Sequence, residues 1–172
     1  MIRKALQAVT LLPANVYLSL NISPNTILKD SLASTLEGLP LERLMLEVTE
    51  HASINDYELV AMQLAPLRQM GLQLAVDDAG AGFASFRHIL QLKPDVIKLD
   101  YSLIHNIDTD RDRRALAAAL IRFAEETGSK VVAEGVETET ELQTLRELNV
   151  NKVQGNLLGC PQDISISCSH RT

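Results

Sequence analysis

Short apolar runs with the two-residue period of a β-strand alternate about six times with stretches of helical period, and no low-complexity linker separates them. This alternation is typical of parallel strands joined by helical crossovers, so it predicts an α/β fold. The strands are expected at residues 16–23, 43–50, 72–78, 95–100, 130–136 and 152–155. The helices are expected at residues 3–12, 24–36, 54–69, 83–90, 110–127 and 138–148. An open doubly wound sheet and a (β/α)8 barrel both satisfy this order.

Local signals place the ends of several of these helices. A Ser-Pro pair at residues 23–24 is typical of an N-cap followed by proline at the first helical position. Gly71 and Gly128 are expected to close the helices that precede them. Thr138, with Glu141 three residues later, has the pattern of a capping box and predicts a helix start.

Each expected strand carries polar or charged side chains near its C-terminal end. These residues are Asn21, Glu47, Asp77 with Asp78, Lys98, Glu134 and Gln154. Taken singly, each is better explained as a turn residue, a helix cap or a snorkelling lysine. In an open sheet a site gathers at one crevice, whereas in a barrel every strand end faces the same mouth. The recurrence therefore favours an incomplete TIM-like (β/α) barrel with about six β/α units.

The strand-end carboxylates predict a cation site. Glu47, Asp77, Asp78 and Glu134 would repel one another strongly if they converged on one mouth. Divalent cations relieve such repulsion, and an all-oxygen site suits Mg²⁺, Mn²⁺ or Ca²⁺. Lys98 adds a positive charge beside them. Gly80 and Gly82 are expected to turn the backbone so that both aspartates face the mouth, although neighbouring residues of a continuing strand point to opposite faces.

Composition and missing motifs exclude several classes of protein. The length of 172 residues fits one domain, and the net charge of −6 argues against a partner that is a nucleic acid polymer. No apolar stretch approaches the roughly 18–20 residues of a membrane segment. Ser85 stands where a GxGxxG fingerprint needs its third glycine, and the sequence contains no phosphate loop and no GxSxG elbow. The two cysteines, Cys160 and Cys168, form no CxxC pair, which indicates a reducing, cytoplasmic compartment.

Six short motifs together resemble one family. They are "SLNISP", "LEVTE", "DDAGAGFAS", "KPDVIKLD", "VVAEGVET" and "VQGNLLGCP", in this order. The ordered set is similar to the EAL domain, the bacterial phosphodiesterase of the second messenger cyclic di-GMP. The resemblance covers residues 1–161 and leaves residues 162–172 as a divergent tail.

The resemblance implies a TIM-like barrel that hydrolyses cyclic di-GMP to linear pGpG with two Mg²⁺ or Mn²⁺ ions. Carried over position by position, it implies that the metal ligands are Asn21, Glu47, Asp77 and Asp78, with Asp77 bridging the two ions. It implies that the catalytic residues are Glu134, at the metal-bound water, and Lys98 and Gln154, which orient that water and the phosphate. It also implies that Glu50 holds the loop at residues 79–85, which contains Gly80 and Gly82 and links catalysis to dimerisation.

The sequence also departs from the family pattern. It has no Glu-Ala-Leu tripeptide and is expected to begin inside the first crossover helix, without the first strand, its metal-binding Glu and a substrate-binding Arg. Ala79, Asn156 and Leu158 stand where Phe, Tyr and Phe are usual, and the tail lacks the last barrel elements.

Missing strands would expose sheet edges, which predicts association through those edges or through the loop at 79–85. Activity is therefore expected to be weak or lost. The alternative is a non-catalytic EAL-like module that binds cyclic di-GMP or a protein partner. An unrelated α/β nucleotide-binding domain is a third interpretation. Sensory or GGDEF-type domains in a larger parent protein are compatible with all three.

Overall fold

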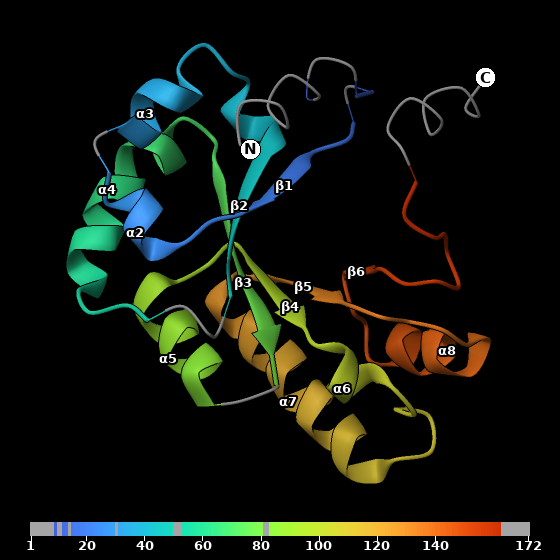
Figure 1. The fold of residues 1–172 in the computed structure, drawn as a ribbon. Helices are drawn as coiled ribbons and strands as arrows, with labels where there is room; N and C mark the ends of the chain where they lie inside the picture. The colour runs from blue at the N-terminus through green and yellow to red at the C-terminus, as the bar shows by residue number, and fades with distance from the viewer. Residues whose placement is uncertain are drawn as a thin grey trace.

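The computed structural model describes residues 9, 12–13, 15–29, 31–49, 53–80 and 83–162. Its centre is a parallel sheet in which each strand pairs with the next along the chain, in the order β1-β2-β3-β4-β5-β6. The strands are β1 (Leu18–Asn21), β2 (Leu44–Thr49), β3 (Gln73–Ala79), β4 (Val96–Leu99), β5 (Lys130–Ala133) and β6 (Lys152–Val153). The sheet curls into a half-barrel with helices on its outer side (Figure 1). The six-unit, incomplete TIM-like barrel expected from the sequence is therefore confirmed.

The helices follow the expected order, with two differences. They are α2 (Pro24–Ile27), α3 (Ser31–Leu36), α4 (Tyr57–Gln69), α5 (Phe83–Leu92), α6 (Tyr101–Ile104), α7 (Arg111–Thr127) and α8 (Glu139–Glu147), together with a 3₁₀ turn at Leu41–Arg43. The single helix expected over 24–36 is two short helices, and the second begins at Ser31, a residue that favours helix starts over helix interiors. The helix α6 was not expected, because four residues are too few to show a helical period.

Several helix ends match their sequence signals. Ser23 caps α2 by accepting the N–H of Thr26 at 3.3 Å, and both bonds of the capping box form at the start of α8. Gly128, with φ +77°, is the C-cap of α7. Gly71 was expected to be the C-cap of α4. The C-cap is Met70 and Gly71 is the next residue, so this prediction is wrong by one residue. It has φ +102°, and its N–H bonds to the carbonyl of Arg68 at 3.0 Å, as in a Schellman motif.

The pleat of the strands separates two layers of side chains. On β2, Leu44, Leu46 and Val48 point outward and pack under the helices. The alternate residue Met45 points inward and joins a small buried cluster with Ala75, Val96 and Val132. Most of the apolar core therefore lies between the sheet and its helices, and the barrel interior holds a thin apolar floor below the strand ends.

The two edge strands approach each other across the opening of the half-barrel. The Lys152 ammonium of β6 lies 4.5 Å from the centroid of the Tyr17 ring, which directly precedes β1. Tyr17 and Gln154 also line one cavity. The sheet is therefore strongly curled, although its first and last strands form no hydrogen-bonded ladder with each other.

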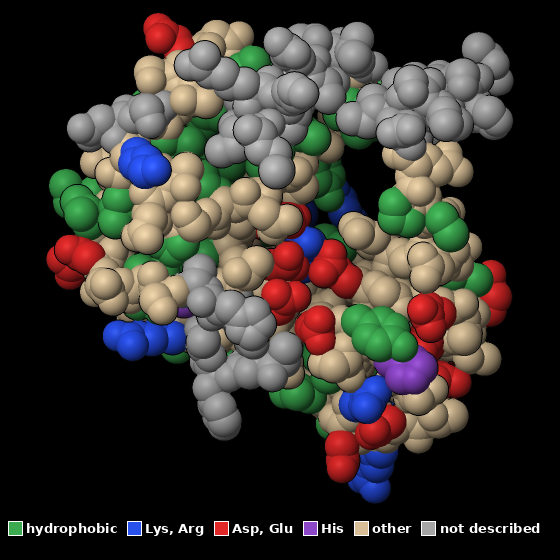
Figure 2. Space-filling view, viewed as in Figure 1, with side chains coloured by type: hydrophobic (Ala, Val, Ile, Leu, Met, Phe, Trp, Pro, Cys, Tyr) green, Lys and Arg blue, Asp and Glu red, His purple; other side chains and the backbone are tan. Residues whose placement is uncertain are grey.

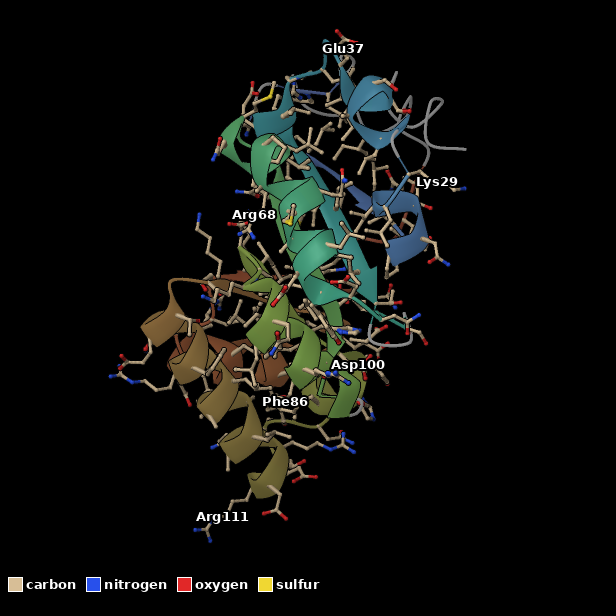
Figure 3. All side chains as sticks on the ribbon, turned by 90° about the vertical axis from the view of Figure 1, so that its left-hand side faces the viewer. Lys29, Glu37, Arg68, Phe86, Asp100 and Arg111 are labelled. Carbon is tan, nitrogen blue, oxygen red and sulfur yellow. The ribbon has the colours of Figure 1, made fainter. Side chains whose placement is uncertain are left out.

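Side-chain contacts fix the outer helices to the strand ends opposite the mouth. Figure 3 shows Arg68 at the end of α4, where it donates to the carbonyls of Leu92 and Lys93 at 3.2 and 3.0 Å. It also donates to the Asp95 carboxylate at 3.0 Å, and the other oxygen of that carboxylate accepts the N–H of Leu74 at 2.8 Å.

None of the helices described is long and apolar enough to cross a membrane. The helix expected at 3–12 and the tail after 162 lie almost entirely outside the described residues.

Candidate active site

The polar residues at the mouth occupy the inward positions of the strands. Glu47 and Asp77 alternate with outward apolar residues on β2 and β3, and Lys98 does the same on β4. Each of these three residues is only 7–8 % exposed. Glu134 directly follows β5, and its N–H bonds to the carbonyl of Leu99 at 3.1 Å, which holds it beside β4. Charged residues are rarely this buried unless they are paired.

Lys98 pairs with three carboxylates at once. Its Nζ atom lies 3.0 Å from Glu47 Oε1, 3.0 Å from Asp77 Oδ1 and 2.9 Å from Glu134 Oε1. An ammonium group has three N–H donors, so each carboxylate can receive one. The structure therefore brings together four residues that lie on four separate strand ends. Figure 2 shows acidic side chains gathered on this face of the molecule.

The charges of this cluster do not balance. Burial opposes the charge on Lys98, but the hydrogen bond to Glu134 and the charges of Glu47 and Glu134 raise its pKa, so it stays protonated. Burial raises the pKa of Glu134; Lys98 acts against this, and the charges of Asp77 and Glu47 add to it. One ammonium therefore serves three carboxylates, and the surplus negative charge attracts further cations.

Asp77 and Asp78 lie at a β-bulge. The register with β4 advances two residues, from Ile97 to Leu99, while β3 advances three, from Val76 to Ala79. Asp78 has φ +59°, a left-handed conformation that Asp tolerates better than most residues, and its N–H donates to Asp77 Oδ1 at 3.1 Å. The backbone therefore turns first at Asp78 itself.

Gly80, one of the two glycines expected to turn the backbone, contributes to the turn after Asp78. Gly80 also has a positive φ of +106°, and a Cβ there would lie 3.1 Å from Leu103 Cδ2. Gly82 and Glu50, the other two residues expected to position this loop, lie outside the described residues. The part of the loop after Gly80 is described again from residue 83.

The remaining expected site residues lie at the edges of the half-barrel. Asn21 ends β1 in an exposed position, in register with Glu47. Gln154 follows β6 and lines a cavity of about 370 Å³ together with Glu47 and Lys98. Ser19, which the strand-end pattern did not single out, also lines this cavity and donates a hydrogen bond to Glu47 Oε1. Its place between Leu18 and Leu20 in the alternating pattern of β1 could have predicted that Ser19 faces the barrel interior.

The donor chemistry of the mouth fits a hard divalent cation. Asn21 offers an amide oxygen, and Glu47, Asp77, Asp78 and Glu134 offer carboxylates on neighbouring strand ends. Among the described residues, no three His, Cys, Asp or Glu side chains are already arranged as a cation cage. The Lys98 ammonium lies where three of the carboxylates meet and contacts one oxygen of each, so each carboxylate keeps a second oxygen that could bind a cation.

Comparison with known sequences points to one family. A profile described as "EAL domain" matches residues 1–161. The bifunctional diguanylate cyclase/cyclic di-GMP phosphodiesterase MucR of Pseudomonas aeruginosa is 35% identical over 136 residues, which are 78% of this chain and 20% of that protein. The cyclic di-GMP phosphodiesterase NbdA of the same organism is 38% identical over 136 residues, 78% of this chain and 17% of that protein. The chain thus spans about a fifth of the length of these relatives.

Solved structures agree with the sequence comparison. The EAL domain of Mycobacterium smegmatis DcpA has a TM-score of 0.88 and 29% identity, over 98% of this chain and 80% of that one. The PaMucR phosphodiesterase in complex with c-di-GMP has a TM-score of 0.84 and 28% identity, over 96% and 76%. The manganese and cyclic di-GMP complex of Klebsiella pneumoniae BlrP1 has a TM-score of 0.75 and 30% identity, over 91% and 41%.

Proposed function

Because this chain belongs to the EAL domain family, we propose that its mouth is a site for hydrolysing cyclic di-GMP to linear pGpG with two divalent cations. The observation that carries the proposal is the convergence of three carboxylates, Glu47, Asp77 and Glu134, on one point at the strand ends. Relatives named as cyclic di-GMP phosphodiesterases, and a structural relative crystallised with manganese and cyclic di-GMP, support the choice of substrate and cofactor.

The metal-binding role falls to the oxygen donors of β1, β2 and β3. We assign it to Asn21, Glu47, Asp77 and Asp78, which would hold the two ions, with Asp77 as the common ligand that the family resemblance implies. When bound, Mg²⁺ or Mn²⁺ would supply Lewis acidity and lower the pKa of water. The N–H of Asp78 donates to Asp77 Oδ1 at 3.1 Å, which holds the Asp77 carboxylate beside the backbone of Asp78.

The proton-transfer role falls to Glu134. Its raised pKa, caused first by burial, makes it a stronger base than an exposed glutamate. In the proposed reaction Glu134 accepts a proton from water, the water oxygen bonds to phosphorus, and one phosphorus–oxygen ester bond breaks. The leaving ribose oxygen takes a proton from solvent and departs as a hydroxyl. Lys98 and Gln154 hold the water and the phosphate in place, which the position of both side chains at the same cavity supports.

We expect slow turnover from residues 1–172 by themselves. β1 and β6 have no neighbour on their outer sides in the described sheet, so the mouth is open to water there. Incubation with Mn²⁺ and cyclic di-GMP, followed by chromatographic detection of pGpG, tests this. We expect slow formation of pGpG by the wild type. Glu134→Gln should abolish this activity, and the exposed control Glu125→Gln should preserve it. Rapid turnover would contradict the expected low activity. If the protein formed no pGpG and showed no metal-dependent nucleotide binding, the proposed function would be refuted.

A second candidate is a non-catalytic module that binds cyclic di-GMP or a protein partner. The observation that favours it is the pairing of three carboxylates with Lys98, which leaves the described site without a ready cation cage. As a nucleotide receptor, such a module would bind cyclic di-GMP equally well in EDTA and in Mn²⁺, whereas a module for a protein partner would bind it in neither. Binding that requires Mn²⁺ would exclude it.

Association and location are also proposals. Open edges at β1 and β6 support self-association, and the loop at 79–85 is a second candidate contact region, which the family resemblance implies. A cytoplasmic location rests on cysteine usage and on the proposed nucleotide substrate.

A further inference from the structure

One exposed aromatic ring stands beside the mouth without a role in the proposed chemistry. Among the described aromatic residues, Tyr17, Phe86 and Tyr101 are more than a third exposed, at 37 %, 38 % and 42 %. Tyr17 precedes β1 and lines the cavity of Glu47 and Lys98, but the Lys152 ammonium already lies 4.5 Å from the centroid of its ring. Phe86 belongs to the outer helix layer (Figure 3). Only Tyr101 of these three follows the C-terminal end of a central strand, three residues after Lys98.

The ring of Tyr101 is fixed between two groups. It stacks on the His105 ring, with centroids 5.1 Å apart and an interplanar angle of 24°. An edge of the ring also packs against Gly135, where an added Cβ would be 2.4 Å from Tyr101 Cδ2, so only glycine fits at this edge. Gly135 directly follows Glu134, the proposed base. The stacked pair therefore borders the catalytic carboxylates.

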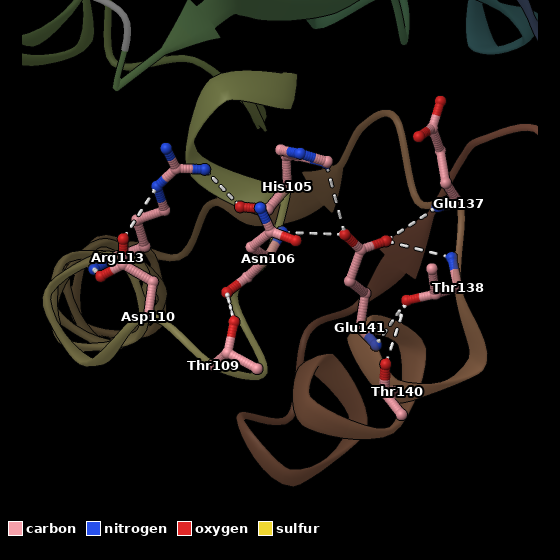
Figure 4. A network of polar contacts seen from close by, with 9 residues as sticks. All are labelled: His105, Asn106, Thr109, Asp110, Arg113, Glu137, Thr138, Thr140 and Glu141. Carbon is pink, nitrogen blue, oxygen red and sulfur yellow. Dashed lines mark hydrogen bonds and ion pairs between the residues drawn. The ribbon is translucent and has the colours of Figure 1, made fainter.

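The loop that carries this stack is tied to the loop after β5. The buried carboxylate of Glu141 accepts the N–H of Asn106 at 2.9 Å and, through its other oxygen, the N–H groups of Glu137 and Thr138 at 3.0 Å each (Figure 4). Figure 4 also shows His105 facing this carboxylate, with Nδ1 3.8 Å from Glu141 Oε1. One side chain thus fixes the segments on both sides of the Tyr101–Gly135 contact.

We propose that the Tyr101–His105 stack is a platform for a purine base of the bound nucleotide, next to the carboxylates that act on its phosphodiester. This inference rests on the proposed function and deepens it, because it assigns base recognition to a described residue. Bases stack well on aromatic side chains, and an immobilised ring loses little further conformational entropy on binding. Tyr101 would thus set the preference for a base-carrying phosphodiester, with Glu141 as a positioning residue.

Paired binding measurements test the platform. Calorimetry in Mn²⁺ with cyclic di-GMP is expected to show about 5- to 100-fold weaker binding for Tyr101→Ala, and a change within about twofold for Tyr101→Phe. The matched control Phe86→Ala leaves affinity unchanged. An abasic ribose phosphodiester is expected to bind Tyr101→Ala and the wild type equally, which a general loss of structure would not produce. Equal cyclic di-GMP affinity of Tyr101→Ala and wild type would overturn the inference.

A second measurement separates the platform from the hydrolysis proposal. The chain contains no tryptophan, so Tyr101→Trp introduces one fluorophore at the stack. Guanosine monophosphate is expected to quench this fluorescence saturably, and to quench that of the control Phe86→Trp, on the outer helix α5, only by collision. Saturable quenching without metal-dependent cyclic di-GMP binding would keep the platform and refute the proposed function. Absence of saturable quenching would overturn the platform, whatever the chain does with cyclic di-GMP.

Discussion

Each charged residue at the mouth depends on its neighbours to remain buried. The sequence predicted Glu47, Asp77, Lys98 and Glu134 as a group because polar side chains recur at strand ends, and the structure places these four in contact. It did not predict the left-handed conformation of Asp78, because a bulge depends on the register between two strands and leaves no periodic trace in one sequence.

Lys98→Met is predicted to destabilise the fold. Removing the ammonium leaves the carboxylates of Glu47, Asp77 and Glu134 buried without a cation, which costs about 3–5 kcal/mol for a broken buried pair. Urea unfolding at neutral pH, with the exposed control Lys29→Met, measures the loss. A loss no larger than that of the control would show that the contacts of Lys98 contribute little to stability.

Asp78 provides a test of the bulge that is separate from its charge. Both Asp78→Gly and Asp78→Ala remove the carboxylate, but only glycine adopts φ +59° without steric cost. Asp78→Ala is predicted to be less stable than Asp78→Gly by about 1 kcal/mol. Thermal unfolding of the two variants measures this difference, and equal stabilities would argue against a left-handed residue at this position.

At the scale of elements, caps and turns decide where helices end and how loops join. Thr138 and Glu141 predicted the start of α8 because the capping-box pattern is local. The second role of Glu141 was not predictable, because its bond to Asn106 joins residues that are 35 positions apart in the sequence. The helix α6 was missed for a related reason, since only the Asp100 cap, which accepts the N–H of Ser102 at 2.8 Å, marks it.

The Glu141 clamp predicts a specific pH dependence of stability. Burial opposes its ionisation, but the N–H groups of Glu137, Asn106 and Thr138 prevail and lower its pKa below the ordinary 4.5. Its contribution is therefore complete above pH about 4.5 and is lost as the pH falls toward the lower folded pKa. Glu141→Gln should be less stable at pH 7, with a gap that narrows below pH about 4.5. Melting temperatures of wild type and Glu141→Gln across this pH range, with the exposed Glu139→Gln as control, measure the difference. A difference that stayed constant with pH would contradict the prediction.

At the scale of the whole molecule, the alternation of strands and helices predicted six β/α units in order, and the described sheet has them. The curl that brings Lys152 to 4.5 Å from the Tyr17 ring could not be predicted, because it depends on the summed twist of all the strands. The open edges at β1 and β6 are the feature with consequences for assembly.

Self-association through β6 can be tested with a single backbone change. The N–H of Gln154 bonds to the carbonyl of Ala133, so the N–H of the preceding Val153 faces the open edge. Val153→Pro removes that donor, and Val153→Ala reproduces the loss of side-chain packing. Light scattering across a dilution series is predicted to show weaker association for Val153→Pro than for Val153→Ala. Identical curves would exclude this edge as the contact.

The central claim is that the strand-end carboxylates recognise cyclic di-GMP through divalent cations, and calorimetric titration of the nucleotide tests it most directly. Wild-type protein is predicted to bind cyclic di-GMP in Mn²⁺ and to lose that binding in EDTA. Asp77→Asn, which removes the proposed bridging charge, is predicted not to bind cyclic di-GMP either in Mn²⁺ or in EDTA. Equal binding by wild type in Mn²⁺ and in EDTA, or undiminished binding by Asp77→Asn in Mn²⁺, would contradict the account.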